Sequence, residues 1–470
     1  MSDAIHTASS AEAFATAKRN ALRRYPSPKH DGARLYPLVS PAVSPQFSVS
    51  AQDSIFAIGS CFARNLEGAL HAAGMNVLSR DPDLGPIGEN VGAASNYLNK
   101  YTAASILNDL KWALERDSFP GEKIIYPVDE NTFCDPQLGL VRLPYPLPEI
   151  MDMRERYLNV MAQAIDADVV IITLGYVETW YDKELDLYLN IAPPPKLCKA
   201  QPDRFEFRVL GFNDVLQALN EIYALLKKHR TKPLKMLLTV SPVPLISTFR
   251  DVDILVANTY SKSVQRAAAE TFVSDKSDVD YFPSYETVTL SNPEVSWSRG
   301  DYRHVSPDVV ARIMSNVLVS YAPDMEVSGV HQGRAMTDGA VKATARMLMK
   351  LNEADELAEL FSANRAIFSA DQALLSEVSS ALQRGGKLTE AADAMHELVE
   401  LAPERPILLQ QLISTVAQNP ENHQKTRALL ATHAKRFPGR EVFRKRVERS
   451  LTPEMQVEQP SDYSFRNGVG

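Results

Sequence analysis

Short apolar segments alternate with longer amphipathic ones between about residues 51 and 330. Three apolar segments, SIFAIG (54–59), DVVIITLG (168–175) and LKMLLTVSP (234–242), end in Gly or Ser-Pro. Continuous apolar runs of this length are typical of strands in a parallel sheet that is covered on both faces. Residues 214–230 between them have leucine and isoleucine at helical spacing. Strands that alternate with helices predict a doubly wound α/β domain, in which ligands bind at the carboxyl ends of the strands.

The pattern differs on either side of this domain. Residues 1–50 are polar and proline-rich, which predicts a short helix followed by an extended arm on the main domain. Residues 340–455 follow helical spacing alone, and 456–470 are expected to form a disordered tail. The window 372–403 resembles a tetratricopeptide repeat with Gly386 at its turn. A generic helical bundle fits equally well, and either reading predicts a packing or protein-partner surface.

Composition narrows the function classes. The 470 residues have a net charge of −8, which argues against nucleic acid as the main partner. No apolar run reaches the roughly 18–20 residues of a membrane span, and the N-terminus lacks a secretory apolar core. The widely spaced Cys61, Cys134 and Cys198 fit a reducing cytoplasm. The basic segment 424–449 is either a solvated helix face or a surface for an acidic partner or membrane. We expect a cytoplasmic protein with no membrane span and no cofactor.

A cysteine stands at the junction of the first strand and the helix after it, where α/β enzymes expose a reactive atom. Gly59 permits a sharp turn, because glycine tolerates backbone angles that other residues avoid. Cys61 then falls in the first helical turn, where backbone N–H groups and the helix dipole stabilise a thiolate and lower the thiol pKa. Ser60 is either the nucleophile or the helix N-cap. Alternatively, these residues have only a structural role, since tight turns need small residues.

A second candidate lies in the segment SRGDYRHVSPDVV. Ser306 and Pro307 predict a helix start, because a hydroxyl side chain caps the helix and proline fits its first position. Asp301 and His304 therefore lie in the preceding loop, where the carboxylate can bind one ring nitrogen while the other acts as a base. A solvated loop pair is the alternative. No second histidine or cysteine stands at ligand spacing, so we expect no metal site.

The segment ITLGYVETW (172–180) ends another central strand. We expect Gly175, Glu178 and Trp180 to project from the loop after this strand into the same cleft as Cys61. The carboxylate and the indole are then candidates for binding sugar-like hydroxyls. Alternatively, the indole of Trp180 caps the core.

Together these motifs resemble the GSCFA family, a branch of the SGNH/GDSL hydrolase-like superfamily. IGSCFARNL at 58–66 is similar to the name-giving motif, and the resemblance continues through LGYVETW, LTVSPVPL, YFPSYE and DYRHVS, over about residues 50–320. It implies a flavodoxin-like three-layer α/β/α fold. It also implies that Cys61 is the nucleophile, where the hydrolases have serine, with Asp301 and His304 as its partners. Thr102, in NKYTAASIL, falls on the second block of the superfamily.

The resemblance also implies how the oxyanion is bound and which substrates are expected. Glu178 stands where many members have an asparagine that donates a hydrogen bond to the oxyanion, which an ionised carboxylate cannot do. Either Glu178 is protonated, or backbone N–H groups near Cys61 hold the oxyanion, or the chemistry is not hydrolytic. We expect an esterase or O-acyltransferase for carbohydrate O-acetyl groups, with Tyr176, Trp180 and Tyr181 as a sugar-stacking platform. The alternative is a non-catalytic scaffold that binds a glycan or a protein.

Overall fold

The computed structural model describes residues 4–27, 35, 38–90, 94–138, 145–325 and 327–451. The chain divides into two compact units, Met1–Met347 and Leu348–Gly470. All strands of the described residues belong to the first unit. The tail expected at 456–470 lies outside the described residues.

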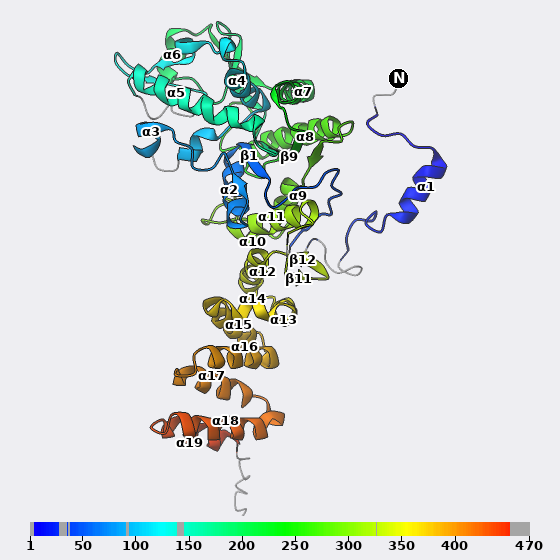
Figure 1. The fold of residues 1–470 in the computed structure, drawn as a ribbon, viewed down its shortest axis with the longest axis vertical. Helices are drawn as coiled ribbons and strands as arrows, with labels where there is room; N and C mark the ends of the chain where they lie inside the picture. The colour runs from blue at the N-terminus through cyan, green and yellow to red at the C-terminus, as the bar shows by residue number, and fades with distance from the viewer. Residues whose placement is uncertain are drawn as a thin grey trace, which may run out of the picture. The chain divides into compact units, whose positions relative to one another are not determined.

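A five-stranded parallel sheet forms the centre of the first unit (Figure 1). Its strands are β1 (Ser54–Gly59), β2 (Asn76–Val77), β5 (Val169–Leu174), β9 (Lys235–Val240) and β10 (Val279–Tyr281). They lie in the order β10-β9-β5-β1-β2. The strand order therefore reverses between β1 and β5, which is where ligands bind in doubly wound sheets of this order. The predicted strands and the α/β class are confirmed.

Helices cover both faces of this sheet, which explains why its strands are apolar from end to end. Successive side chains of a strand point to opposite faces, so alternate residues belong to different cores. Ile58 and Ile172 pack in one core with residues of α4 and α7, whereas α2 contacts β1 and β5 from the other side. Figure 1 shows α4, α5, α7 and α8 on one face and α2, α9 and α11 on the other. These helices are α2 (Cys61–Ala72), α4 (Ala103–Leu114), α5 (Leu147–Ala162), α7 (Phe212–His229), α8 (Ile254–Val273), α9 (Ser284–Leu290) and α11 (Pro307–Tyr321).

A second, antiparallel sheet follows β5 directly. It consists of β6 (Glu178–Asp182), β7 (Leu187–Leu189) and β8 (Phe205–Val209), in the order β7-β6-β8. The expectation that Glu178 and Trp180 project from a loop is therefore wrong. The segment ETWYD is rich in residues that favour a pleated, half-buried surface, and it pairs with strands on both sides.

The remaining elements of the first unit are short. They are α1 (Ser10–Arg19), α3 (Gly85–Asn90), η1 (Ala94–Leu98), η2 (Arg116–Ser118), η3 (Gly121–Ile124), β3 (Tyr126–Pro127), β4 (Phe133–Cys134), η4 (Gln163–Ile165), α6 (Pro195–Ala200), α10 (Pro293–Ser296), β11 (Gly329–His331) and β12 (Arg334–Met336). In the described residues, no helix combines the length and the apolar character needed to cross a membrane.

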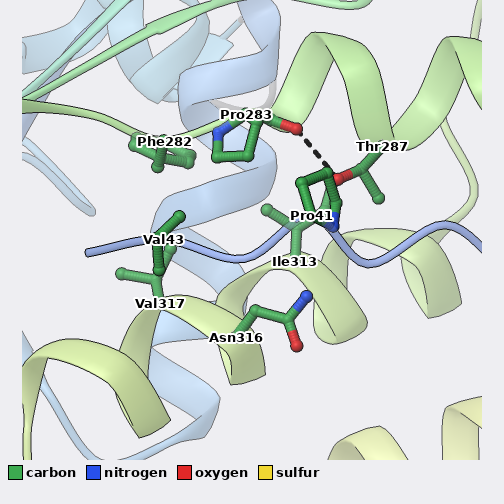
Figure 2. Close-up of a pocket in the computed structure, with 8 residues that line it drawn as sticks. All are labelled: Pro41, Val43, Phe282, Pro283, Thr287, Ile313, Asn316 and Val317. Carbon is green, nitrogen blue, oxygen red and sulfur yellow. Dashed lines mark hydrogen bonds between the residues drawn. The ribbon is translucent and has the colours of Figure 1, made fainter. Parts of the chain in front are cut away.

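Residues 38–50 of the N-terminal arm are hydrogen-bonded to later segments of the first unit. The backbone N–H of Val39 donates to Ser291 Oγ (3.0 Å), that of Gln46 to Asp280 Oδ2 (2.9 Å) and that of Val49 to the Tyr321 carbonyl (2.7 Å). Figure 2 shows the arm crossing a groove whose lining includes residues of α9 and α11. The cavity left there has a volume of about 10 Å³, which is too small for a ligand larger than water. Its lining residues are Pro41, Val43, Phe282, Pro283, Thr287, Ile313, Asn316 and Val317.

The predicted helical C-terminal region is confirmed. Helix α12 (Asp338–Leu351) crosses the division between the units, and the helices after it contact one another in chain order from α15 to α19. Gly386 has a φ of +77° at the turn between α15 and α16, and a Cβ on Gly385 would lie 2.2 Å from that of Ala354. These helices are α13 (Ala354–Ala363), α14 (Arg365–Ser369), α15 (Gln372–Arg384), α16 (Leu388–Leu401), α17 (Pro406–Val416), α18 (His423–Arg436) and α19 (Glu441–Leu451), with η5 (Pro420–Asn422) before α18.

Candidate functional site

Cys61 is the first residue of α2, immediately beyond the carboxyl end of β1. Gly59 has a φ of +136°, and a Cβ there would lie 2.1 Å from the carbonyl oxygen of Thr173. The turn therefore requires glycine. Ser60 is the N-cap of α2: its Oγ accepts the backbone N–H of Phe62 (3.3 Å), and the residue is only 4% exposed. Cys61 is the more accessible of the two candidate nucleophiles.

The carboxyl end of β5 lies beside this junction. A Cβ on Gly175 would lie 2.6 Å from the carbonyl oxygen of Tyr101, which also accepts the backbone N–H of Tyr176 (2.8 Å). The rings of Tyr101 and Tyr176 stack with their centroids 5.1 Å apart. The backbone N–H of Lys100 donates to the Gly59 carbonyl (2.6 Å). The ends of β1 and β5 and the segment 100–101 thus meet at the point where the strand order reverses.

The prediction that the start of α2 lowers the pKa of the Cys61 thiol is wrong. Burial raises the pKa of the Cys61 thiol above its ordinary value, although Arg303, Lys262 and the backbone N–H groups of Cys61 and Phe62 act in the opposite direction. The predicted helix-start effect exists, but the loss of hydration outweighs it. A neutral thiol needs a base to become a nucleophile.

Asp301 and His304 form the predicted pair. His304 Nδ1 lies 2.6 Å from Asp301 Oδ2, and Asp301 Oδ1 accepts the backbone N–H groups of His304 (2.8 Å) and Arg303 (2.9 Å). These bonds, that to the His304 N–H first, lower the pKa of Asp301 to about 2. With Nδ1–H donated to the carboxylate, Nε2 is the nitrogen that can take up a proton.

The loop that holds this pair is fixed at both ends. The backbone N–H of Ser298 donates to the His304 carbonyl (2.7 Å), and that of Ser306 donates to the Ser296 carbonyl (2.9 Å). Helix α11 begins at Pro307, as predicted, with Ser306 as N-cap residue but without a side-chain capping bond. Helix α11 packs on α2, and the charge of Arg303 acts on the Cys61 thiol. The Asp301–His304 loop thus carries a charge, on Arg303, that lowers the pKa of the Cys61 thiol.

Glu178 holds a loop in place. Thr248 Oγ1 lies 2.8 and 2.9 Å from its two carboxylate oxygens and donates to this carboxylate, and the backbone N–H of Phe249 lies 3.4 Å from one of them. Glu178 is only 7% exposed. Its carboxylate thus accepts hydrogen bonds and fixes the segment after β9. A partner 70 residues away in sequence is not visible in the pattern around Glu178.

Trp180 packs edge-on against Phe249 and Phe207, with ring centroids 5.2 and 5.9 Å apart. Tyr181 lies under the guanidinium of Arg208, 3.5 Å from the ring centroid. Thr102 is fully buried and caps α4, with its Oγ1 accepting the backbone N–H of Ser105 (3.1 Å). The structure gives each of these three candidate binding residues a packing or capping partner within the protein.

Lys262 is a buried residue at this site that the sequence motifs do not reveal. This residue of α8 is fully buried, and its Nζ donates to the carbonyl oxygens of Gly175 (2.6 Å) and Val243 (2.7 Å). Burial lowers the pKa of Lys262 to about 7, against an opposing effect of Cys61. One feature of the sequence could have revealed it: the polar residues Lys262 and Gln265 lie on the helix face that carries the buried alanines of α8.

The described residues contain no group of three or more His, Cys, Asp and Glu side chains arranged to hold a metal ion.

Comparison with known proteins agrees with the motifs at this site. Residues 54–316 match the GSCFA family. No match was found among curated proteins or among solved structures. The matched region spans more than half of the 470 residues and contains Cys61, Lys262, Asp301 and His304. This chain belongs to the GSCFA family.

Proposed function

We propose that this chain is an acyl-ester enzyme of the SGNH hydrolase-like type, an esterase or O-acyltransferase with Cys61 as nucleophile. The observation that supports it most is the Asp301–His304 hydrogen bond in a loop whose Arg303 acts on the Cys61 thiol. The thiol itself stands at the reversal of strand order, where this class of sheet binds ligands.

In the proposed mechanism, Nε2 of His304 takes the proton of the Cys61 thiol, and Asp301 stabilises the resulting imidazolium. The sulfur attacks the ester carbonyl carbon. As the C–O bond of the ester breaks, His304 returns the proton to the leaving alcohol, and a thioester remains on Cys61. Water or a sugar hydroxyl then gives its proton to His304 and attacks the thioester, which releases the acyl group and the thiolate, and His304 returns the proton to the sulfur.

The negative charge that develops on the carbonyl oxygen needs donors. The backbone N–H of Cys61, at the start of α2, is the proposed oxyanion donor, since that of Phe62 is already donated to Ser60 Oγ (3.3 Å). Glu178 is not one of them in this proposal, because its carboxylate accepts the hydrogen bond of Thr248. We assign Glu178 to holding the loop at 248–249 in place.

The proposals for the substrate class and the cellular location rest on the sequence alone. Carbohydrate O-acetyl esters are the proposed substrates, and the cytoplasm is the proposed location. The helical unit is proposed as a tetratricopeptide-like surface for a protein partner. In support, α15 and α16 form a contacting helix pair joined at Gly386, and the next helices continue in chain order.

The test is to assay the full chain against acyl esters and O-acetylated sugars, with Cys61→Ala as the key variant. We expect Cys61→Ala to abolish acyl release while its thermal unfolding stays like that of wild type. Cys198→Ala is the matched control, because Cys198 is also partly exposed but lies on α6, and it should retain full activity. Full activity of Cys61→Ala would overturn the mechanism. Tight sugar binding without turnover by wild type would favour the non-catalytic scaffold.

A further inference from the structure

The hairpin of β11 and β12 carries two basic side chains on one face. Its register places His331 opposite Arg334 and Gly329 opposite Met336. Residues that stand opposite each other in an antiparallel pair point to the same face, and so do residues two positions apart in one strand. His331, Arg334 and Met336 therefore share a face. His331 and Met336 are only 7% and 1% exposed, whereas Arg334 beside the turn is exposed, so this face is open to solvent at Arg334.

Helix α11 covers this face with an arginine. The helix contacts β12, and Nη1 of Arg312 donates to Sδ of Met336. Met336 and His331 are diagonal neighbours on the hairpin, about 7–8 Å apart. Burial, followed by the charge of Arg334, lowers the pKa of Arg312 to about 10, and Arg312 in turn acts on His331. The three basic side chains thus lie close enough to repel one another.

Arg312 lacks the partners that a buried guanidinium requires. It is only 4% exposed, its Nε is buried without a hydrogen-bond partner, and the sulfur that Nη1 contacts is a weak acceptor. Arg312 forms no ion pair with a carboxylate of the described residues. Arg154 is also buried, but its guanidinium pairs with Asp109 and Asp135. Since an unpaired buried charge is costly, the surroundings of Arg312 lack an anion.

The imidazole on the same face is also unsatisfied. His331 Nδ1 is buried and has no hydrogen-bond partner within the described ranges. Asp338, the described carboxylate nearest to the hairpin in sequence, accepts the hydroxyl of Ser328 (2.7 Å). Arg334 donates Nη1 to the carbonyl oxygen of Ser40 (2.9 Å), a neutral acceptor that leaves its charge uncompensated. Donors on the hairpin and on α11 therefore converge without an acidic partner among the described side chains.

We propose that Arg312, Arg334 and His331 form a binding site for a phosphate group, either free phosphate or a phosphate ester on a small soluble molecule. A guanidinium binds two phosphate oxygens through parallel N–H donors, and Nε of Arg312 is available for one of them. Two guanidinium charges match the charge of about −1.5 to −2 on a phosphate ester near neutral pH, whereas a carboxylate would leave one of them uncompensated.

The anion reaches Arg312 past the exposed Arg334. A small molecule fits this route better than a lipid surface, because Arg312 is almost fully buried. Met336 yields its place at Nη1 to a phosphate oxygen, since its side chain is unbranched and flexible. Nδ1–H of the neutral His331 imidazole is the third donor. The site goes beyond the proposed function, because it contains none of the residues assigned to the reaction at Cys61.

The test is isothermal titration calorimetry of the full chain at about pH 7.5, with inorganic phosphate, methyl phosphate and acetate as probes at matched ionic strength. Wild type should bind phosphate at least about tenfold more tightly than acetate. Arg312→Met should weaken phosphate binding about tenfold or more. Arg346→Met is the matched control, because Arg346 is an exposed arginine of α12 that pairs with Asp308, and it should bind phosphate as wild type does. Binding of methyl phosphate distinguishes a phosphate ester from the free ion as ligand.

Thermal unfolding separates this role from a structural one. Replacing an unpaired buried cation by an apolar side chain removes a cost, so Arg312→Met in chloride buffer should melt no lower than wild type. Phosphate should raise the melting temperature of wild type but not that of Arg312→Met. If Arg312→Met does not fold, Arg334→Gln at the exposed end of the site replaces it and should weaken phosphate binding several-fold.

Three results would overturn the inference. The first is wild type that binds phosphate no better than acetate. The second is a folded Arg312→Met with the phosphate affinity of wild type. The third, where Arg312→Met does not fold, is an unchanged phosphate affinity of Arg334→Gln.

Discussion

Asp301 and His304 are joined by a 2.6 Å hydrogen bond between Oδ2 and Nδ1, and the second carboxylate oxygen binds the backbone of the same loop. The carboxylate is therefore oriented before any substrate arrives. In the proposed reaction it fixes the tautomer of His304 that presents Nε2 as base.

Replacing Asp301 by asparagine tests this orientation. Asp301→Asn removes the negative charge that stabilises the imidazolium, and we expect kcat/KM for ester turnover to fall by about 10²–10⁴-fold. The matched control is Asp308→Asn, which removes a carboxylate seven residues later that pairs with Arg346 (2.7 Å). It should change turnover less than about twofold. A fully active Asp301→Asn would show that the pair is structural.

Gly175→Ala tests the close approach at the end of β5. The new Cβ would lie 2.6 Å from a backbone oxygen that cannot move easily, so we expect a loss of about 1–3 kcal/mol in the free energy of unfolding. The control is Gly68→Ala in the interior of α2, where no atom lies within 4 Å of the new Cβ. There the helix should gain about 0.5–1 kcal/mol. Urea denaturation measures both, and equal stability of the two variants would contradict this packing.

A buried ion network should dominate the stability of the region between α4 and α5. Arg154 lies 3.0 Å from Asp109 and 2.5 Å from Asp135, and all three side chains are inaccessible. Arg154→Met leaves two carboxylates with less positive charge, so we expect a loss of about 3–5 kcal/mol. Arg156→Met, two residues along the same helix, breaks only exposed pairs with Asp152 and Asp83 and should cost less than about 1 kcal/mol. Chemical denaturation that finds equal losses would contradict the assignment.

His331 should make the first unit sensitive to acid. Burial, aided by Arg312, lowers the pKa of His331 to about 4 from an ordinary 6.5. The unfolded chain then binds the proton more readily than the folded one between these values. Stability is therefore fully present above about pH 6.5 and is lost as pH falls towards 4, by up to about 3 kcal/mol.

The measurement is thermal unfolding of wild type and His331→Gln across this range. The melting temperature of wild type should fall more steeply with acid than that of the variant. Parallel curves would show that His331 does not contribute.

Local patterns explain which features the sequence predicts. The runs at 54–59, 168–175 and 234–242 gave β1, β5 and β9 because a strand covered on both faces needs continuous apolar side chains. The Asp301–His304 hydrogen bond was predictable because the two residues lie three positions apart in one loop. The raised pKa of the Cys61 thiol was not predictable, because the thiol becomes buried only when segments distant in sequence meet in the fold. Contacts such as Glu178–Thr248 leave no trace in either segment alone.

The nucleophile is tested most directly by trapping the acyl group. Wild-type protein is mixed with a chromogenic acetyl ester, quenched in acid within the first turnover and digested for peptide mass spectrometry. Our account predicts one acetyl group, on the sulfur of Cys61, that hydroxylamine removes and that is absent from Cys61→Ala. Ester turnover with the acetyl group on Ser60, or with Cys61 unmodified at every time point, would contradict it.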